Sequence, residues 1–171
     1  MNNIIFNYIK KGDISSALEY IKTHKNIDTV KKRNGVNILM EAIVSKQDAI
    51  SKYIINANID INAQDKAGFS ALHYCVWEKN IAIAKLLLEK GANVNIIDKY
   101  GNNPFWYSLT LYRTSFDIDF VKLLIIYGAD IHNKNYSNLS PYDFAKILND
   151  DNINEILSKV VNNGVKTDNI E

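Results

Sequence analysis

The residues of this chain that could do chemistry are few, and their spacing does not bring them together. Cys75 is the single cysteine among 171 residues, and His73 lies two positions before it. Residues two apart on a helix point in different directions, so these two side chains cannot share a metal ion or form a nucleophile–base pair. The sequence has no phosphate-binding glycine loop, paired-carboxylate site or zinc spacing. We therefore expect no enzyme activity, no cofactor and no metal site.

Charge and hydropathy argue against two classes of partner. The chain has a formal net charge of +1, and its one tight basic run, Lys31-Lys32-Arg33, is too short for the phosphate neutralisation that drives nucleic-acid binding. No stretch has the length and apolarity needed to cross a bilayer, and the first residues lack the features of a secretion signal. We expect a cytoplasmic monomer that binds neither nucleic acid nor membrane. Its wealth of Asn, Ile and Lys is typical of a microbe or virus with an AT-rich genome.

A short motif of a turn residue followed by a helix cap recurs at nearly constant spacing, and the fold that it predicts must position the side chains discussed above. The turn residues Gly35, Gly68, Gly101 and Asn138 lie 33, 33 and 37 residues apart. Two residues after each comes a good helix N-cap, and the two prolines of the chain directly follow two of these caps, where a helix tolerates proline. The four caps are Asn37, Ser70, Asn103 and Ser140. A period of this length predicts stacked helix pairs, each of which buries its apolar face only against its neighbours.

These residues resemble the ankyrin repeat. Residues 65–97 match its signature best, with the turn at Gly68, the helix start Ser70-Ala71-Leu72-His73, a leucine-rich stripe and the cap Gly91-Ala92. The resemblance implies an all-α ankyrin-repeat solenoid of stacked helix pairs with β-turn or hairpin loops. It also implies a non-enzymatic protein–protein interaction module. In this fold His73, at a helix start, is expected to hydrogen-bond the backbone between repeats, and Cys75 to be a packed thiol.

We expect a single ankyrin domain over residues 1–171. Its parts are an N-terminal capping helix pair (1–31), a repeat (32–64), a second repeat (65–97), a third repeat with a four-residue insertion (98–134), and a C-terminal capping repeat with a tail (135–171). The insertion falls between Leu109 and Phe120 and is expected to lengthen the turn between two paired helices. It is either a neutral surface turn or, through its apolar residues Leu111, Tyr112 and Phe116, a part of the binding surface.

In ankyrin stacks the turn tips and the first helix of each pair line a concave face, where a partner would bind. Tyr, Trp and Arg dominate the energetics of protein interfaces, so aromatic residues in this phase are candidates. The alternative is that residues such as Trp77 and Tyr107 only pack against adjacent repeats, and Trp106 is assigned to the core. The candidate protein-binding residues are Arg33, Glu41, Phe69, Tyr74, Trp77, Tyr100, Tyr107, Tyr112, Arg113 and Tyr136.

The third repeat also resembles, more loosely, bacterial ankyrin immunity proteins encoded beside polymorphic toxins. The likeness is carried by residues 99–106, by the lengthened segment with Arg113, and by residues 119–124 and 140–145. It implies that a cognate toxin domain is masked by the concave face or the inserted turn. The alternative is a microbial or viral effector, or host-range protein, that acts on a host protein. Genomic neighbourhood would separate the two.

Overall fold

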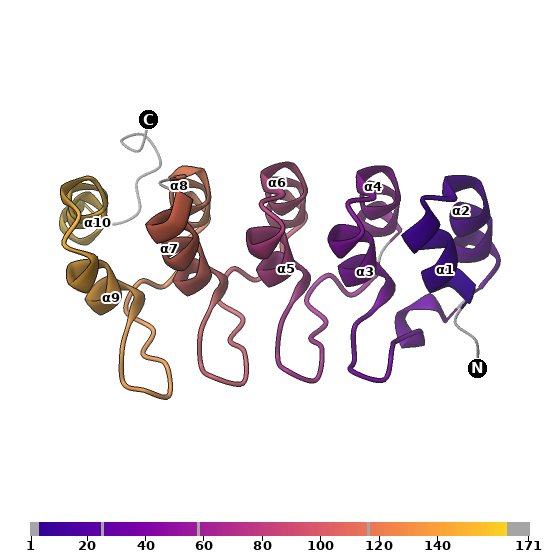
Figure 1. The fold of residues 1–171 in the computed structure, drawn as a ribbon, viewed down its shortest axis with the longest axis horizontal. Coiled ribbons are helices and arrows are strands. Elements are labelled where there is room, and N and C mark those ends of the chain that lie inside the picture. The colour runs from indigo at the N-terminus through magenta and orange to yellow at the C-terminus, as the bar shows by residue number, and fades with distance from the viewer. Residues whose placement is uncertain (1–3, 25, 58, 116, 164–171) are drawn as a thin grey trace. The chain divides into compact units, whose positions relative to one another are not determined.

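A computed structural model describes residues 4–24, 26–57, 59–115 and 117–163. The chain forms two compact units, residues 1–93 (unit 1) and 94–171 (unit 2). In the described part the chain folds into ten α-helices and one short 3₁₀ helix, η1(Ile27–Thr29), and contains no strand. The predicted all-α class with stacked helix pairs is confirmed (Figure 1).

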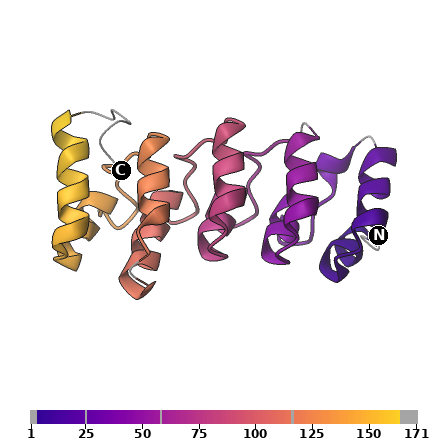
Figure 2. The ribbon, with the colours of Figure 1, turned by 90° about the horizontal axis from the view of Figure 1, so that it is seen from above.

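Unit 1 is built from three helix pairs. They are α1(Ile4–Lys11) with α2(Ile14–Thr23), α3(Ile38–Val44) with α4(Asp48–Asn56), and α5(Ala71–Trp77) with α6(Ile81–Glu89). The first helices α1, α3 and α5 contact one another in one row, and α2, α4 and α6 form a second row beside it (Figures 1 and 2). The pairs are joined by long turns that project from the helices, and single antiparallel bridges, Lys31 to Asn37 and Gln64 to Ser70, close two of these turns into hairpin loops.

Unit 2 contains two further pairs. They are α7(Pro104–Ser115) with α8(Asp119–Ile126), and α9(Pro141–Leu148) with α10(Asp151–Asn163). Helix α7 contacts both α8 and α9, and α9 contacts α10. The core of this unit contains Phe105, Leu109, Phe120 and Leu124, each no more than 1% exposed. Burying one such side chain contributes about 1.5–3 kcal/mol, so the pairs stabilise each other chiefly through these contacts.

The predicted caps form the hydrogen bonds expected of them. The side-chain oxygen of Asn37 accepts from the Met40 amide at 2.9 Å, and that of Asn103 accepts from the Trp106 amide at 3.0 Å. Ser70 and Ser140 each belong to a capping box, with His73 and Asp143 as the third helical residues. The three turn glycines have φ between 81° and 89°, and Asn138 has φ 60°. Asn58, which lies one 33-residue repeat before the cap glycine Gly91 in the sequence, is outside the described residues.

The four-residue insertion lengthens a helix instead of a turn, which corrects the expectation from the sequence. Helix α7 has 12 residues, whereas the equivalent helices α3 and α5 have 7 each. Its additional turn buries Tyr112, which is 4% exposed and donates its hydroxyl to Asp150 Oδ1 at 2.9 Å. Tyr112 is therefore not available to a partner as proposed, whereas Arg113 beside it is exposed. Phe116 lies outside the described residues.

Candidate functional site

Three aromatic side chains of unit 1 form a cluster at the base of the second hairpin turn. Phe69 precedes the cap of α5, and Tyr74 and Trp77 lie one turn apart on α5. The Phe69 and Trp77 rings have centroids 4.3 Å apart at 70°, and the Tyr74 and Trp77 rings are 5.4 Å apart at 86°. Edge-to-face contacts of this kind are favourable and fix the ring orientations. Trp77 nevertheless remains 41% exposed, so the aromatic cluster presents an apolar surface that neighbouring rings support.

A hydrogen bond ties this cluster to the turn below it. The Tyr74 hydroxyl donates to Asp65 Oδ2 at 2.8 Å, and Asp65 Oδ1 accepts from the amides of Ala67 and Phe69. Burial, assisted by this bond to a carboxylate, raises the pKa of Tyr74 above its ordinary value, so the phenol stays neutral. Asp65 thereby sets the position of Phe69, Tyr74 and the turn tip together.

A side-chain connection between residues nine apart recurs in the two neighbouring repeats, as the same Tyr–Asp pair in one and as a Lys–Glu pair in the other. In unit 2 the Tyr107 hydroxyl donates to Asp98, and Asp98 Oδ1 accepts from the Tyr100 amide at 2.8 Å. In the first repeat of unit 1 the Lys32 ammonium donates to the carboxylate of Glu41. These connections were not predicted, although complementary residues recur nine positions apart in the sequence, at 32 and 41, 65 and 74, and 98 and 107.

Glu41 is not an exposed binding residue, contrary to the expectation from the sequence. It is 4% exposed, paired with Lys32, and has Lys10 Nζ 3.9 Å from its Oε1. Its carboxylate is therefore occupied inside unit 1. A buried carboxylate without such partners would be strongly unfavourable, so Lys32 and Lys10 explain why this position tolerates an acid.

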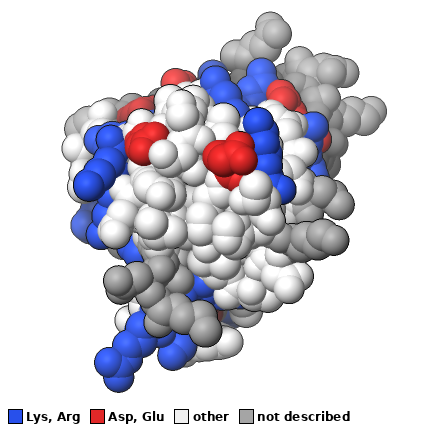
Figure 3. Space-filling model, turned by 90° about the vertical axis from the view of Figure 1, so that its right-hand side faces the viewer, with Lys and Arg blue, Asp and Glu red and all other residues white. Residues whose placement is uncertain are grey.

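Exposed basic side chains lie on the two turn tips of unit 1. Arg33 and Lys66 are both exposed, and the tips touch because the Lys66 amide donates to the Asn34 carbonyl at 2.9 Å. In Figure 3, Lys and Arg side chains lie at the lower edge and also along the left and upper right of the visible face, whereas most of the visible Asp and Glu atoms lie in the upper half. The tips thus add positive charge to the neighbourhood of the aromatic cluster.

In unit 2 the remaining candidate residues differ in exposure. Tyr100 is 53% and Tyr136 75% exposed, and they meet at adjacent turn tips, where the Tyr136 amide donates to the Tyr100 carbonyl at 2.9 Å. Tyr107 is half-buried against Asp98. Trp106 is not a core residue as expected but half-buried, because its ring stacks on Phe144 with centroids 4.9 Å apart at 26°.

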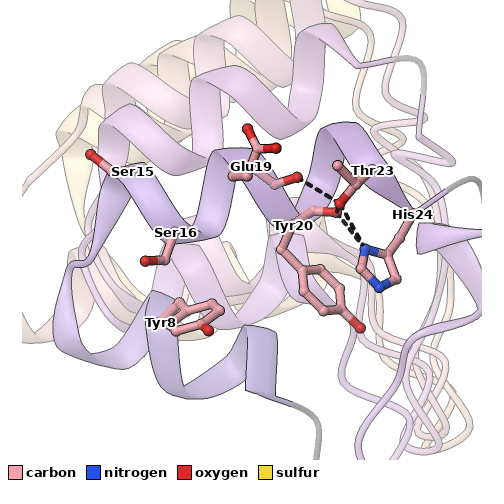
Figure 4. A pocket seen from close by; sticks show the side chains of 7 residues that line it. All are labelled: Tyr8, Ser15, Ser16, Glu19, Tyr20, Thr23 and His24. Carbon is pink, nitrogen blue, oxygen red and sulfur yellow. Dashed lines mark hydrogen bonds between the residues drawn. The ribbon is translucent and has the colours of Figure 1, made fainter.

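A hollow that was not expected from the sequence lies on helices α1 and α2. It is shallow and open, has a volume of about 470 Å³, and is lined by Tyr8, Ser15, Ser16, Glu19, Tyr20, Thr23 and His24 (Figure 4). The rings of Tyr20 and His24 stack with centroids 3.7 Å apart, and His24 Nδ1 lies 2.8 Å from the Tyr20 carbonyl oxygen, to which it donates. The spacing of four between Tyr20 and His24 was the signal available in the sequence.

His73 and Cys75 are both buried and have structural contacts. His73 Nδ1 accepts from the Ser70 amide at 3.1 Å and completes the capping box of α5. Burial raises the pKa of the Cys75 thiol well above its usual range, so the thiol stays protonated. Within the described segments, no group of three His, Cys, Asp or Glu side chains is placed to hold a metal ion. None of the helices described is long and apolar enough to span a bilayer.

Comparison with known proteins agrees with this geometry. A scan of protein-family models matches residues 5–98 to the family described as ankyrin repeats (3 copies). A search of curated proteins finds no match. The matched segment covers all three helix pairs of unit 1 together with its hairpin turns, and the turn, cap and helix-pair pattern recurs in unit 2. The chain therefore belongs to the ankyrin repeat family.

Proposed function

We propose that this chain binds a partner protein through the surface of unit 1 formed by Arg33, Phe69, Tyr74 and Trp77. Ankyrin repeats are generally protein–protein interaction modules. The observation that carries the proposal is Trp77, which stays 41% exposed although two neighbouring rings fix its orientation. A rigid, exposed tryptophan loses little conformational entropy on binding, and Trp, Tyr and Arg are the residues that most often dominate interface energies.

We propose further that the bound partner is blocked, as a toxin domain is blocked by an immunity protein. The support is the likeness of the third repeat to bacterial ankyrin immunity proteins and the lengthening of α7 in that repeat alone among the pairs described. Exposed Arg113 near the end of α7 would then make contacts of its own. We place this activity in the cytoplasm and assign it to the monomer. A host-directed effector is the competing role, and a toxin gene beside the coding sequence would favour the inhibitor.

Affinity purification of the tagged chain from its native host tests the proposal. Trp77→Ala should reduce recovery of the partner at least about tenfold, since removing a central interface tryptophan typically costs about 2 kcal/mol or more. Ile147→Ala is the control, because Ile147 is 65% exposed on α9, outside the proposed surface. Melting curves of both variants exclude unfolding as the cause. Equal recovery by all three proteins would contradict the proposed site.

A further inference from the structure

We infer that the partner segment recognised by unit 1 is acidic and carries an apolar side chain. Its carboxylates bind Arg33 and Lys66, and its apolar side chain packs on Trp77. This inference rests on the proposed function and adds to it the chemical class of the partner. It concerns an interaction surface within unit 1 alone.

The charged and apolar parts belong to one continuous surface. The turn tips that carry Arg33 and Lys66 are joined by the hydrogen bond from the Lys66 amide to the Asn34 carbonyl. Lys66 lies three residues before Phe69 on the same turn, and such a segment spans at most about 10 Å. Phe69 in turn contacts Trp77. A single extended segment can therefore reach both cations and the tryptophan.

The turn tips and the carboxylates that contact them carry a positive formal charge, because Lys32, Arg33 and Lys66 stand against Glu41 and Asp65. Asp65 accepts hydrogen bonds at both carboxylate oxygens, from two amides and from Tyr74. Glu41 is buried against Lys32 and Lys10. Among the residues described, neither Arg33 nor Lys66 takes part in an ion pair. Neighbouring exposed cations repel one another within a Debye length of about 8–10 Å, and partner carboxylates would relieve that repulsion.

The same features favour a protein over a nucleic acid. Nucleic-acid binding draws its affinity from many phosphate contacts, about 6–10 in a typical DNA-binding protein, and the two turn tips supply far fewer. The aromatic cluster is locked edge-to-face, with Tyr74 bonded to Asp65, so its rings do not form parallel platforms for successive bases. An apolar side chain, in contrast, needs only an exposed ring edge or face, which Trp77 offers.

Selection from a random linear-peptide display library on the intact chain tests the inference. The enriched peptides should combine Asp or Glu with Trp, Phe or Leu. Synthetic copies should bind more weakly as salt rises, and the double variant Arg33→Glu/Lys66→Glu should weaken them at least about tenfold. The matched control is Lys85→Glu/Lys90→Glu, which makes the same charge change on exposed residues at α6 and its C-cap and should leave the dissociation constant unchanged.

The possible outcomes separate this inference from the proposed function. Neutral or basic peptides that still require Trp77 would overturn the acidic partner while supporting the binding surface. Peptides whose binding is insensitive to Trp77→Ala would overturn both. A single-stranded oligonucleotide that displaces the peptides at equal charge would show general polyanion binding and reject the inference. Failure to enrich any peptide would also reject it, because a linear acidic segment is then not recognised.

Discussion

Two lysines of unit 1 occupy a backbone conformation that normally favours glycine. Lys46 and Lys79 have φ of 56° and 55°, in the turns that join α3 to α4 and α5 to α6. Gly12 has the same conformation between α1 and α2, with φ 67°. The conformation is required because the next residue returns its amide to the preceding helix, as Asn80 does to the Cys75 carbonyl at 2.9 Å. The left-handed conformation costs an L-residue with a side chain about 1–2 kcal/mol, so each of these two lysines carries conformational strain of that size.

We predict that Lys79→Gly stabilises the protein by about 0.5–1 kcal/mol, because relief of the left-handed strain exceeds the added entropy of glycine in the unfolded chain. Urea denaturation measures the change. Lys90→Gly is the control, since Lys90 is also exposed but has an ordinary φ of −87°. That variant should lose up to about 1 kcal/mol. A loss of stability in both variants would show that strain at Lys79 is not significant.

At the residue scale, local features could be predicted from the sequence and burial could not. The caps Asn37 and Ser140 and the turn glycines follow from a few neighbouring residues, and all have the expected geometry. Glu41 and Tyr112 were misplaced because their surroundings depend on distant partners. The partner of Glu41 lies nine residues earlier, and that of Tyr112 lies 38 residues later. From sequence alone a carboxylate is expected at the surface unless the cation that pairs with it is known.

At the level of elements, repeat register predicted where helices start better than where they end. Helix starts are marked by caps and prolines, whereas helix ends have no such mark here. Helices α3 and α5 end after seven residues and α7 continues to Ser115, although none of the three contains or is directly followed by glycine. Leu109 and Tyr112, three residues apart, keep one buried face along the added turn. That helical spacing, read without the repeat alignment, would have predicted the longer helix.

Helix α9 carries a cap whose strength should depend on pH. Asp143 Oδ2 accepts from the Ser140 hydroxyl at 2.7 Å and from the Ser140 amide at 3.1 Å. These bonds hold the pKa of Asp143 below its ordinary value. Since the folded state favours the carboxylate, the cap contributes stability above the pKa that Asp143 has in the unfolded chain. This contribution is lost as pH falls through the lower pKa of the folded state.

We therefore predict that Asp143→Asn lowers the melting temperature at neutral pH and weakens its dependence on acid pH. Melting curves recorded by circular dichroism between neutral and strongly acidic pH measure both effects. Asp151→Asn, a change at an exposed carboxylate in the first turn of α10, is the control and should keep the wild-type pH dependence. If Asp143→Asn and the wild type lose stability in parallel, the Asp143 carboxylate does not strengthen the cap in the way inferred.

At the scale of the whole molecule, the recurring period predicted the stacking of helix pairs but not the division into two units. The motif continues in phase across residue 93 without a linker rich in glycine or proline. The division depends on how extensively each helix pair contacts the next one. A repeat signature is the same for every repeat and therefore does not show which of these contacts are weaker. The aromatic cluster was not predicted either, because the contact between Phe69 and Trp77 depends on how one repeat folds and not on the repeat signature.

Within unit 1 the central pair α3–α4 contacts a pair on each side, α1–α2 and α5–α6. In a stack with nearest-neighbour energetics, the pair with two interfaces opens at higher free energy than a pair that has one. We predict that, in native-state hydrogen exchange of the full chain, amides of α3 and α4 are protected more strongly than those of α1 and α2.

The variant Ile9→Ala removes a fully buried side chain from α1. It should lower the opening free energy of amides in α1 and α2 by about 2–5 kcal/mol. It should leave the protection of α5 and α6 nearly unchanged. Equal protection in all three pairs, lowered equally by Ile9→Ala, would mean that unit 1 opens as one cooperative body and that stability is not a sum over neighbouring pairs.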